Sequence, residues 1–418
     1  MKMTQIQNKF IIIIPTRNSS DTLKYTLKTC IEQLDYNNYT IIVSDNNSSD
    51  NTKTMVEGFN SKQIQYINTF KDVAMNKNWE FALNYALSHY DSGYITYIGS
   101  DDGITPEALK ITNDLINKYH EDVVYCCRPT YTWPLKSEDT ELGDGEIYFK
   151  LSNHTYIKKS SSYLEQMAIG KRRYSELPSI YYSFININLI QHIISTSKDG
   201  LFFTGIAPDV YSAITITSQC ESFLYVEYPL TLAGISTNSN GRATLSFEND
   251  DCKRKRLDFQ KLDNTQQLFK YISSVKFAEY EALLIAKENL SLKIQIPHKR
   301  WVKQILTDLQ GSPKSYYLPS IEALYKCKSI KPFLPNIESI LNKYPNDNNR
   351  NNTELKWRGY WAYCKSRNLN NIDDASRWIY TLFSCKKPQG VKNIFFVRIS
   401  EKIQSTFQYV LKRIAYES

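Results

Sequence analysis

Two adjacent carboxylates, Asp101 and Asp102, follow the apolar run YITYI at residues 94–98 and precede Gly103. An apolar run of this length, rich in aromatic and β-branched residues, predicts a buried strand, so both carboxylates are expected at its tip. Carboxylates repel a diphosphate, whereas a divalent cation shared by carboxylate and phosphate oxygens reverses that repulsion. The pair therefore predicts a site for Mn²⁺ or Mg²⁺, although Asp-Asp-Gly is also ordinary turn chemistry.

Polar residues also follow two other apolar runs. The run FIIII at 10–14 leads into Pro15, Thr16 and Arg17, and the short run at 41–43 leads into Asp45. Ligands of doubly wound α/β sheets bind outside the carboxyl ends of the strands. We therefore expect these three strand ends to converge on one crevice, although Asp45 taken alone is better explained as a turn or helix-capping residue.

The order of elements defines the expected fold class. Strand patterns alternate with helical patterns, which is typical of an α/β protein with a doubly wound sheet. Strands are expected at residues 10–14, 41–43, 64–67, 94–98 and 123–127, with strand-like character again over 223–235. Beyond about residue 250 the pattern is helical with few strand signals, so we expect a mainly helical C-terminal region.

The last stretch, residues 396–414, places apolar residues on one face of an expected helix and basic residues elsewhere on it. Such a helix can lie on an anionic membrane, and packing against the helical region is the alternative. The N-terminal apolar run is too short for a signal peptide, and no apolar stretch approaches the length of a membrane span.

Composition limits the class of protein. The 418 residues carry a net charge of +8, which fits an anionic partner such as a nucleotide diphosphate, and the basic residues form no nucleic-acid-binding motif. The eight cysteines include no CxxC pair and read as core residues of a protein from a reducing compartment. We expect a cytoplasmic protein, peripheral at the inner face of the membrane if its last helix binds lipid.

Three motifs in register resemble one enzyme family. FIIIIPTRNSSDTLKYTLKTCIEQ, IIVSDNNSSDNT and YITYIGSDDG, in this order and spacing, resemble family 2 glycosyltransferases of the GT-A fold. The resemblance covers residues 8–235 and is firmest over 8–110. It implies a GT-A-like mixed sheet flanked by helices and transfer of a sugar from a nucleotide diphosphate donor with inversion.

The resemblance also assigns the donor-binding residues. Pro15, Thr16 and Arg17 match the loop that lies along the nucleotide, with Arg17 where the common motif has Tyr. Asp45 matches the aspartate that contacts the nucleobase, often uracil. Asp101 and Asp102 match the end of the DxD-type motif that holds ribose and metal. Gly99 replaces the frequent first Asp of that motif, so the division of labour between the two carboxylates stays open.

The remaining candidates lie farther along the chain. In this family a carboxylate at a helix start takes the proton of the acceptor hydroxyl, and Asp209, after Pro208, matches it. Asp199 and Glu221 are the alternatives, and simple helix capping is the structural explanation. Lys77 and Arg242 lie where basic residues could meet phosphate, against a plain solvated helix face or surface loop.

The sequence thus predicts a catalytic nucleotide-sugar-binding domain over residues 1–245 and a helical domain over 246–418. The expected function is an inverting, metal-dependent transfer from a UDP-sugar to a glycan or lipid-linked saccharide in bacterial surface polysaccharide synthesis. The alternatives are a non-catalytic subunit of the same fold and a sugar nucleotidyltransferase. The loop PTRNSSD is not the Gly-rich basic loop that a nucleotidyltransferase needs, which disfavours the last of these.

Overall fold

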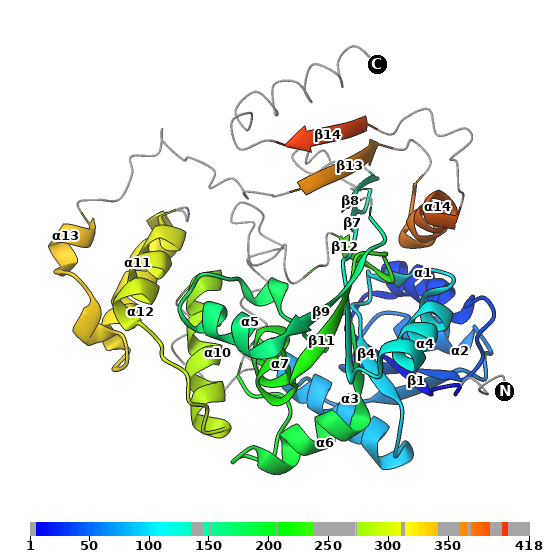
Figure 1. Cartoon of the computed structure of the whole chain (residues 1–418), viewed down its shortest axis with the longest axis horizontal. Coiled ribbons are helices and arrows are strands. Elements are labelled where there is room, and N and C mark those ends of the chain that lie inside the picture. The colour runs from blue at the N-terminus through cyan, green and yellow to red at the C-terminus, as the bar shows by residue number, and fades with distance from the viewer. Residues whose placement is uncertain are drawn as a thin grey trace.

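The computed structural model describes residues 6–134, 145–150, 152–205, 207–236, 239, 272, 274–310, 314–341, 359–365, 369–384 and 395–399. A large sheet lies at the centre with helices on both faces, and a second sheet lies beside it toward the C-terminus (Figure 1). Among these residues no helix is both long and apolar enough to cross a bilayer.

The first sheet is mixed, in the order β3-β2-β1-β4-β10-β6-β11-β9. Strands β3, β2, β1 and β4 are parallel to one another. Strand β10 runs antiparallel to both β4 and β6, and β9 runs antiparallel to β11. The strands are β1 (Phe10–Thr16), β2 (Tyr39–Asp45), β3 (Ile64–Asn68), β4 (Tyr94–Tyr97), β6 (Val123–Cys126), β9 (Thr155–Lys159), β10 (Ser183–Asn186) and β11 (Ser222–Val226).

Both faces of this sheet are covered, which explains why β1 is apolar at successive positions rather than alternating. Phe10, Ile12 and Ile14 face α1 (Ser20–Ile31), α2 (Thr52–Glu57) and α4 (Ala108–Tyr119). Ile11 and Ile13 face the opposite way, toward α3 (Met75–His89) and α6 (Ile187–Thr196). The five residues Phe10–Ile14 are completely buried, so β1 is the centre of the fold.

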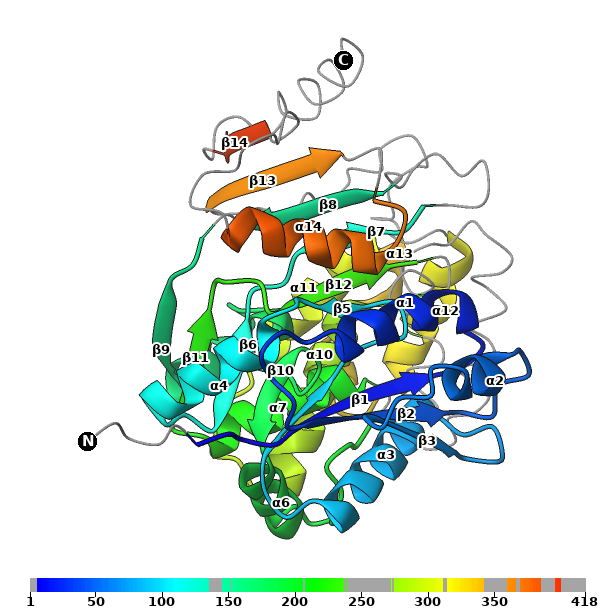
Figure 2. The same ribbon diagram turned by 90° about the vertical axis from the view of Figure 1, so that its right-hand side faces the viewer.

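The second sheet has the order β14-β13-β8-β7-β12-β5 and joins distant parts of the chain. Its strands are β5 (Gly103–Ile104), β7 (Thr130–Thr132), β8 (Glu146–Lys150), β12 (Thr231–Ile235), β13 (Gly359–Lys365) and β14 (Phe395–Ile399). Helix α14 (Ile372–Ser384) packs against this sheet and against α1, as Figure 2 shows. Ile372, Ala375 and Ile379 of α14 are buried with Tyr131 and Leu232 of the sheet.

A helical layer follows the first sheet on the side of β9 and β11 (Figure 1). Its core contains Trp301, Tyr211 and Tyr280, and Trp301 donates its indole N–H to the carbonyl of Ala168 at 2.8 Å. The elements are α5 (Ser160–Ala168), η1 (Tyr174–Glu176), α7 (Pro208–Gln219), α10 (Val275–Asn289), α11 (His298–Leu309), α12 (Lys314–Lys326), η3 (Lys331–Phe333) and α13 (Ile337–Leu341).

These elements confirm the expected α/β class with a mixed, helix-flanked sheet and a mainly helical C-terminal region. Every strand expected before residue 130 is present. One expectation for the C-terminal region is corrected: residues 395–399 form the strand β14, paired with β13, rather than the start of a helix. Residues 395–399 are mostly aromatic and β-branched, and such residues favour strands over helices.

Residues 400–414 of the expected amphipathic helix lie outside the described residues, and so does the expected domain boundary at 245/246. That boundary remains a prediction.

Candidate active site

One edge of the first sheet gathers the chemically active residues. Because β1, β2, β4 and β6 run in the same direction, their carboxyl ends lie along one edge, which we call the carboxyl edge. The loops that carry Asp45, Asp101 and Arg128 leave the sheet there. Strand β10 runs the other way, so Tyr182 just before it reaches the same edge.

Asp102 is a fully buried carboxylate whose two oxygens are both occupied. Its Oδ2 accepts hydrogen bonds from the backbone N–H of Gly99 at 2.5 Å and the hydroxyl of Tyr181 at 2.6 Å. Its Oδ1 accepts the N–H of Gly234 in β12 at 2.7 Å. Burial raises the pKa of Asp102, and these hydrogen bonds oppose that rise because they favour the ionised form. Asp102 therefore ties the loop after β4 to β10 and β12.

Asp101 is held differently, because the other described residues hydrogen-bond to one of its two oxygens. Its Oδ2 accepts the hydroxyl of Ser236 at 2.7 Å and the Ser236 N–H at 3.3 Å. Its Oδ1 accepts no hydrogen bond from another residue that the structure describes. Burial, and then the neighbouring charge of Asp102, raises the pKa of Asp101 to about 7. Among the described residues, Oδ1 of Asp101 is therefore the oxygen of the pair to which no other residue donates.

Gly99 stands where the related motif has its frequent first Asp, and the space beside it is filled. A Cβ at this position would lie 2.4 Å from the hydroxyl of Tyr181 and 2.8 Å from Oδ2 of Asp102. A carboxylate at residue 99 therefore has no room unless Tyr181 moves. The tyrosine hydroxyl takes the place of that side chain and donates to Asp102.

These contacts bear on which carboxylate could hold a divalent cation. Asp102 has no unoccupied oxygen, whereas Oδ1 of Asp101 suits one-oxygen ligation of Mg²⁺ or Mn²⁺, which commonly take one or two carboxylates plus substrate phosphates. In the part of the chain that the structure describes, no three His, Cys, Asp or Glu side chains cluster as a complete protein-only metal site. The residues thus fit a cation completed by phosphate oxygens.

Asp45 is buried at the end of β2, with 1% of its surface exposed. Its Oδ1 accepts the N–H of Ser48 at 2.9 Å, and its Oδ2 accepts the hydroxyl of Tyr66 at 2.5 Å and the amide of Asn68 at 3.3 Å. The carboxylate orders the loop after β2 and orients Tyr66. Tyr66 itself is partly exposed, so its ring borders the surface on which the nucleobase was predicted to lie.

The loop after β1 lies beside this network. Pro15 is partly buried, and Thr16 is buried with a hydroxyl that lacks a partner among the described residues. Arg17 forms an ion pair with Asp72 at 2.7 Å, and Asp72 also accepts the amide of Asn47 at 3.0 Å. Through Asp72, these two contacts join the loops after β1, β2 and β3. Arg17 therefore borders the predicted nucleotide surface and also holds its loops in place.

The two other basic candidates differ in what can be said of them. Lys77 is exposed in the first turn of α3, which begins next to the loop after β2. The loop after β2 reaches that turn through Asn46, whose amide donates to the carbonyl of Val73 at 2.8 Å. Arg242 lies outside the described residues.

Asp209 lies in the first turn of α7, which Pro208 begins, as predicted. It is half-buried, and the Ser179 hydroxyl donates to its backbone carbonyl at 2.9 Å, which ties α7 to the loop before β10. Burial raises the pKa of the Asp209 carboxyl, while hydrogen bonds from Val210 and Tyr174 and the charge of Arg128 oppose the rise. Asp209 therefore lies at the carboxyl edge, in an environment that favours a proton acceptor.

The two alternatives to Asp209 lie in other environments. Asp199 accepts hydrogen bonds from Ser197, Thr204 and Asn289, which hold a loop together. Glu221 is exposed and follows the last residue of α7, at the end of that helix opposite Asp209.

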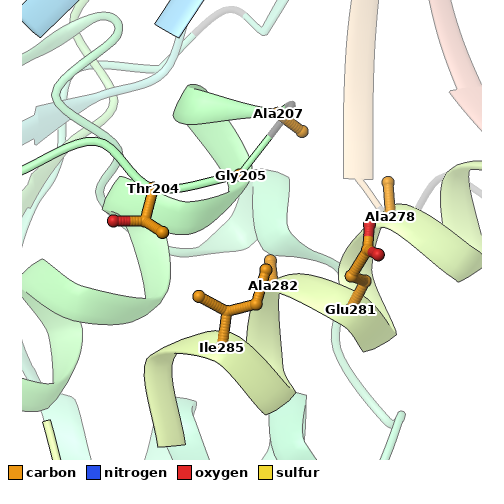
Figure 3. Close-up of a pocket in the computed structure, with 7 residues that line it drawn as sticks. All are labelled: Thr204, Gly205, Ala207, Ala278, Glu281, Ala282 and Ile285. Atoms are coloured by element: carbon orange, nitrogen blue, oxygen red, sulfur yellow. The ribbon is translucent and has the colours of Figure 1, made fainter. Parts of the chain in front are cut away.

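A small cavity lies just before α7, and Figure 3 shows its lining. Its volume of about 10 Å³ is room for about one water molecule. The lining consists of Thr204, Gly205 and Ala207 of the loop and Ala278, Glu281, Ala282 and Ile285 of α10. The cavity is too small for a sugar ring, so it is part of the packing between α7 and α10.

The sequence interpretation missed several residues of the carboxyl edge. Tyr181, Gly234 and Ser236 hold the two carboxylates, and Arg128 follows β6. The rule that pointed to Asp45 and Asp101 applies equally to the end of the 123–127 strand, and it would have selected Arg128. No local signal marks the other three, because their partners are more than 75 residues away in sequence.

A family model and two relatives identify this chain as a glycosyltransferase. Residues 11–176 match the profile described as Glycosyl transferase family 2, so the chain carries a family 2 glycosyltransferase domain.

Two curated relatives match part of the chain. A GalNAc(5)-diNAcBac-PP-undecaprenol beta-1,3-glucosyltransferase of Campylobacter jejuni is 28% identical over 125 residues, 28% of this chain and 38% of the relative. An uncharacterized glycosyltransferase of Rickettsia typhi is 26% identical over 128 residues, 30% of this chain and 38% of the relative. The matches thus span well under half the length of each relative.

Solved structures with similar features are more distant in sequence. S. aureus TarS 1-349 in complex with UDP-GlcNAc is 16% identical, with a TM-score of 0.43 over 78% of this chain and 89% of that chain. The mannosyltransferase PcManGT from Pyrobaculum calidifontis, in complex with GDP-Man and Mn²⁺, is 14% identical, with a TM-score of 0.38 over 81% and 86%.

Proposed function

We propose that this protein is an inverting, metal-dependent glycosyltransferase that transfers a sugar from a nucleotide diphosphate donor to a hydroxyl acceptor. The observation that carries the proposal is the division of roles at the carboxyl edge. Oδ1 of Asp101 accepts no hydrogen bond from the other described residues, whereas both oxygens of Asp102 accept hydrogen bonds that hold the loop. Asp209 lies in the first turn of α7 at the same edge.

The donor is proposed to lie along the carboxyl ends of β1, β2 and β4. Pro15, Thr16 and Arg17 border the nucleotide, and Asp45 acts through Tyr66 at the nucleobase, for which uracil is the proposed partner. Lys77 and Arg242 are the proposed basic residues near the phosphates. Oδ1 of Asp101 would hold Mn²⁺ or Mg²⁺, which supplies positive charge to the departing diphosphate.

Asp209 is the proposed general base. As the acceptor oxygen attacks the anomeric carbon, its proton passes to the Asp209 carboxylate, and the bond from that carbon to the phosphate oxygen breaks with its electron pair on the diphosphate. Tyr174 and Arg128 both favour the ionised form of Asp209, so the carboxylate is kept ready to accept the proton.

A lipid-linked saccharide is the proposed acceptor, and bacterial surface polysaccharide synthesis is the proposed setting. Support comes from the Campylobacter jejuni relative, whose name states a saccharide on undecaprenol diphosphate. We further propose a catalytic domain over residues 1–245 and an acceptor- or membrane-associated region over 246–418, at the cytoplasmic face of the membrane.

The test compares wild type with Asp209→Asn. Calorimetry with UDP and Mn²⁺ measures donor binding, and release of UDP from UDP-sugars measures slow donor hydrolysis and transfer. We expect Asp209→Asn to bind UDP with unchanged affinity and to lose about 100-fold or more in turnover. Glu221→Gln, an acid at the opposite end of α7, is the matched control and should keep full turnover.

Two results would contradict the proposal. If Asp209→Asn turns over at the wild-type rate, the assignment of the base is wrong. If the wild-type protein binds UDP but hydrolyses and transfers no sugar from any tested donor, the protein is a non-catalytic subunit of the same fold.

A further inference from the structure

Arg128 is a cation at the carboxyl edge that has no carboxylate within ion-pair distance among the described residues. It lies in the short loop between β6 and β7 and is partly buried. Its guanidinium lies over the ring of Tyr182, 4.2 Å from the ring centroid. Among the described residues no carboxylate comes within the 4.0 Å that defines an ion pair with it.

The other partly buried arginines of this structure are paired. Arg17 contacts Asp72 at 2.7 Å, and Arg172 contacts Glu176 at 2.6 Å. A charge taken out of water without a partner is costly, so proteins rarely keep one without a reason. An anionic substrate group that docks on Arg128 would complete its interactions.

The surroundings of this guanidinium favour its charged form. Burial lowers the pKa of Arg128, but Tyr125, Tyr182, Tyr174 and Asp102 outweigh it and raise the pKa. Arg128 in turn helps to keep Asp209 ionised. The guanidinium is therefore within electrostatic reach of both Asp102, beside the metal-binding candidate, and Asp209, the proposed base.

The platform under Arg128 is built at a conformational cost. Tyr182 has a φ of 73°, in the left-handed region that aromatic residues rarely adopt. With this backbone conformation, the two successive tyrosine side chains make different contacts. Tyr181 donates its hydroxyl to Asp102 at 2.6 Å, and Tyr182 lies under Arg128. The backbone at Tyr182 thus fixes the position of the Asp102 carboxylate relative to the Arg128 guanidinium.

We propose that Arg128 binds the diphosphate of the donor and stabilises it as the leaving group. The proposal rests on the proposed function. Asp101 and Asp102 bring two negative charges to the site, which one divalent cation would offset without also balancing the diphosphate, so additional positive charge favours diphosphate binding. A guanidinium presents parallel N–H donors that match phosphate oxygens and are in place before charge develops on them.

The chemical step needs no reactant beyond donor and acceptor. The acceptor oxygen forms a bond to the anomeric carbon, the acceptor proton moves to Asp209, and the carbon–oxygen bond to the diphosphate breaks. The electron pair of that bond remains on the phosphate oxygen, and Arg128 donates hydrogen bonds to the diphosphate that carries it.

The test measures what the phosphates add to affinity. Binding of uridine, of UDP and of a UDP-sugar is measured by calorimetry for wild type, Arg128→Gln and Arg128→Lys, once with EDTA and once with Mn²⁺. We expect Arg128→Gln to weaken UDP about 10-fold or more while uridine binding is unchanged. Arg128→Lys, which keeps the charge but not the planar fork, should fall between the two.

Arg172→Gln is the matched control. Arg172 also lies over a tyrosine ring, 4.0 Å from the centroid of Tyr163, but is ion-paired and belongs to the helical layer. The Arg172→Gln variant should bind UDP with the affinity of wild type. The melting temperature of each variant, measured without ligand, reports on folding.

The proposal is overturned if Arg128→Gln binds UDP as tightly as wild type. It is also overturned if affinities for uridine and UDP fall equally, because Arg128 would then act on the fold alone. If only the full UDP-sugar loses affinity, Arg128 contacts the sugar and the diphosphate assignment is wrong. Absence of any nucleoside diphosphate binding by wild type would instead count against the proposed function.

Discussion

The backbone N–H of Gly234 lies 2.7 Å from Oδ1 of Asp102, although the two residues are 132 positions apart. This contact brings β12 directly against the loop that follows β4. The carbonyl of Asp101 lies in the same contact, where it accepts the indole N–H of Trp133 at 2.9 Å. The two carboxylates are therefore positioned by the second sheet as much as by the strand that precedes them.

Replacement of Gly234 by Ala should break this contact. A Cβ on Gly234 would lie 1.8 Å from the backbone oxygen of Asp101, and backbone cannot swing aside as a flexible side chain can. We expect a loss of about 3 kcal/mol or more in the free energy of unfolding, measured by denaturant titration. Gly58→Ala is the control. Its Cβ would lie 3.3 Å from the carbonyl oxygen of Thr54, so we expect this substitution to change the free energy of unfolding far less than Gly234→Ala.

Substitution of each carboxylate by the amide should separate their roles. Asp102→Asn replaces an acceptor oxygen with an NH₂ group among three donors, so we expect about 2–4 kcal/mol of destabilisation. Asp101→Asn should leave the melting temperature near or above that of wild type, because it removes repulsion from Asp102. The same variant should lose the gain in UDP affinity that Mn²⁺ gives wild type.

Calorimetry with and without Mn²⁺, together with thermal melts, checks both variants. The assignment is reversed if Asp102→Asn is stable and loses the metal effect while Asp101→Asn keeps it.

The pKa of Asp101 predicts a dependence of stability on pH. The folded-state pKa of about 7 exceeds the ordinary value of 3.8, so between these values the folded protein binds more protons than the unfolded chain. The contribution of Asp101 to stability is therefore greatest below about pH 4 and is lost as the pH rises toward 7. Denaturant titrations from pH 5 to pH 8 should show this slope in wild type and a shallower slope in Asp101→Asn.

A divalent cation should change that profile. Because the cation binds the ionised carboxylate, Mn²⁺-dependent UDP affinity should rise with pH through about 7. An Mn²⁺ effect of the same size at pH 6 and pH 8 would show that Asp101 is not the ligand.

The sequence predicts the first sheet well because its signals are local. Runs such as Phe10–Ile14 are apolar at successive positions only when both faces of a strand are covered, and turn residues mark where each strand stops. Once the strands are parallel, their polar ends must share an edge, so Asp45, Asp101 and Asp102 could be grouped without coordinates. Pro208 likewise marks the start of α7 and so the position of Asp209.

The second sheet and the contacts of the site could not be predicted in this way. Strands β5, β7 and β12 have two to five residues each, and their pairing depends on distant segments. Whether Asp101 or Asp102 keeps an open oxygen depends on Tyr181, Gly234 and Ser236, which no pattern near the carboxylates reveals. The apolar spacing predicts a helix from residue 396 onward, but residues 395–399 form β14. The reason is that strand pairing with β13, a segment about 35 residues earlier, leaves no signal in that spacing.

Helix α14 has a consequence for engineering of this enzyme. It packs on α1, and the Ser376 hydroxyl donates to the carbonyl of Ile104 at 2.7 Å, two residues after the Asp101–Asp102 pair. A chimera that exchanged everything after residue 245 for the tail of another enzyme would remove this support from the loop that carries Asp101 and Asp102. A chimera designed to test the proposed acceptor-associated region should therefore exchange only α10 to α13 and retain α14 of the recipient.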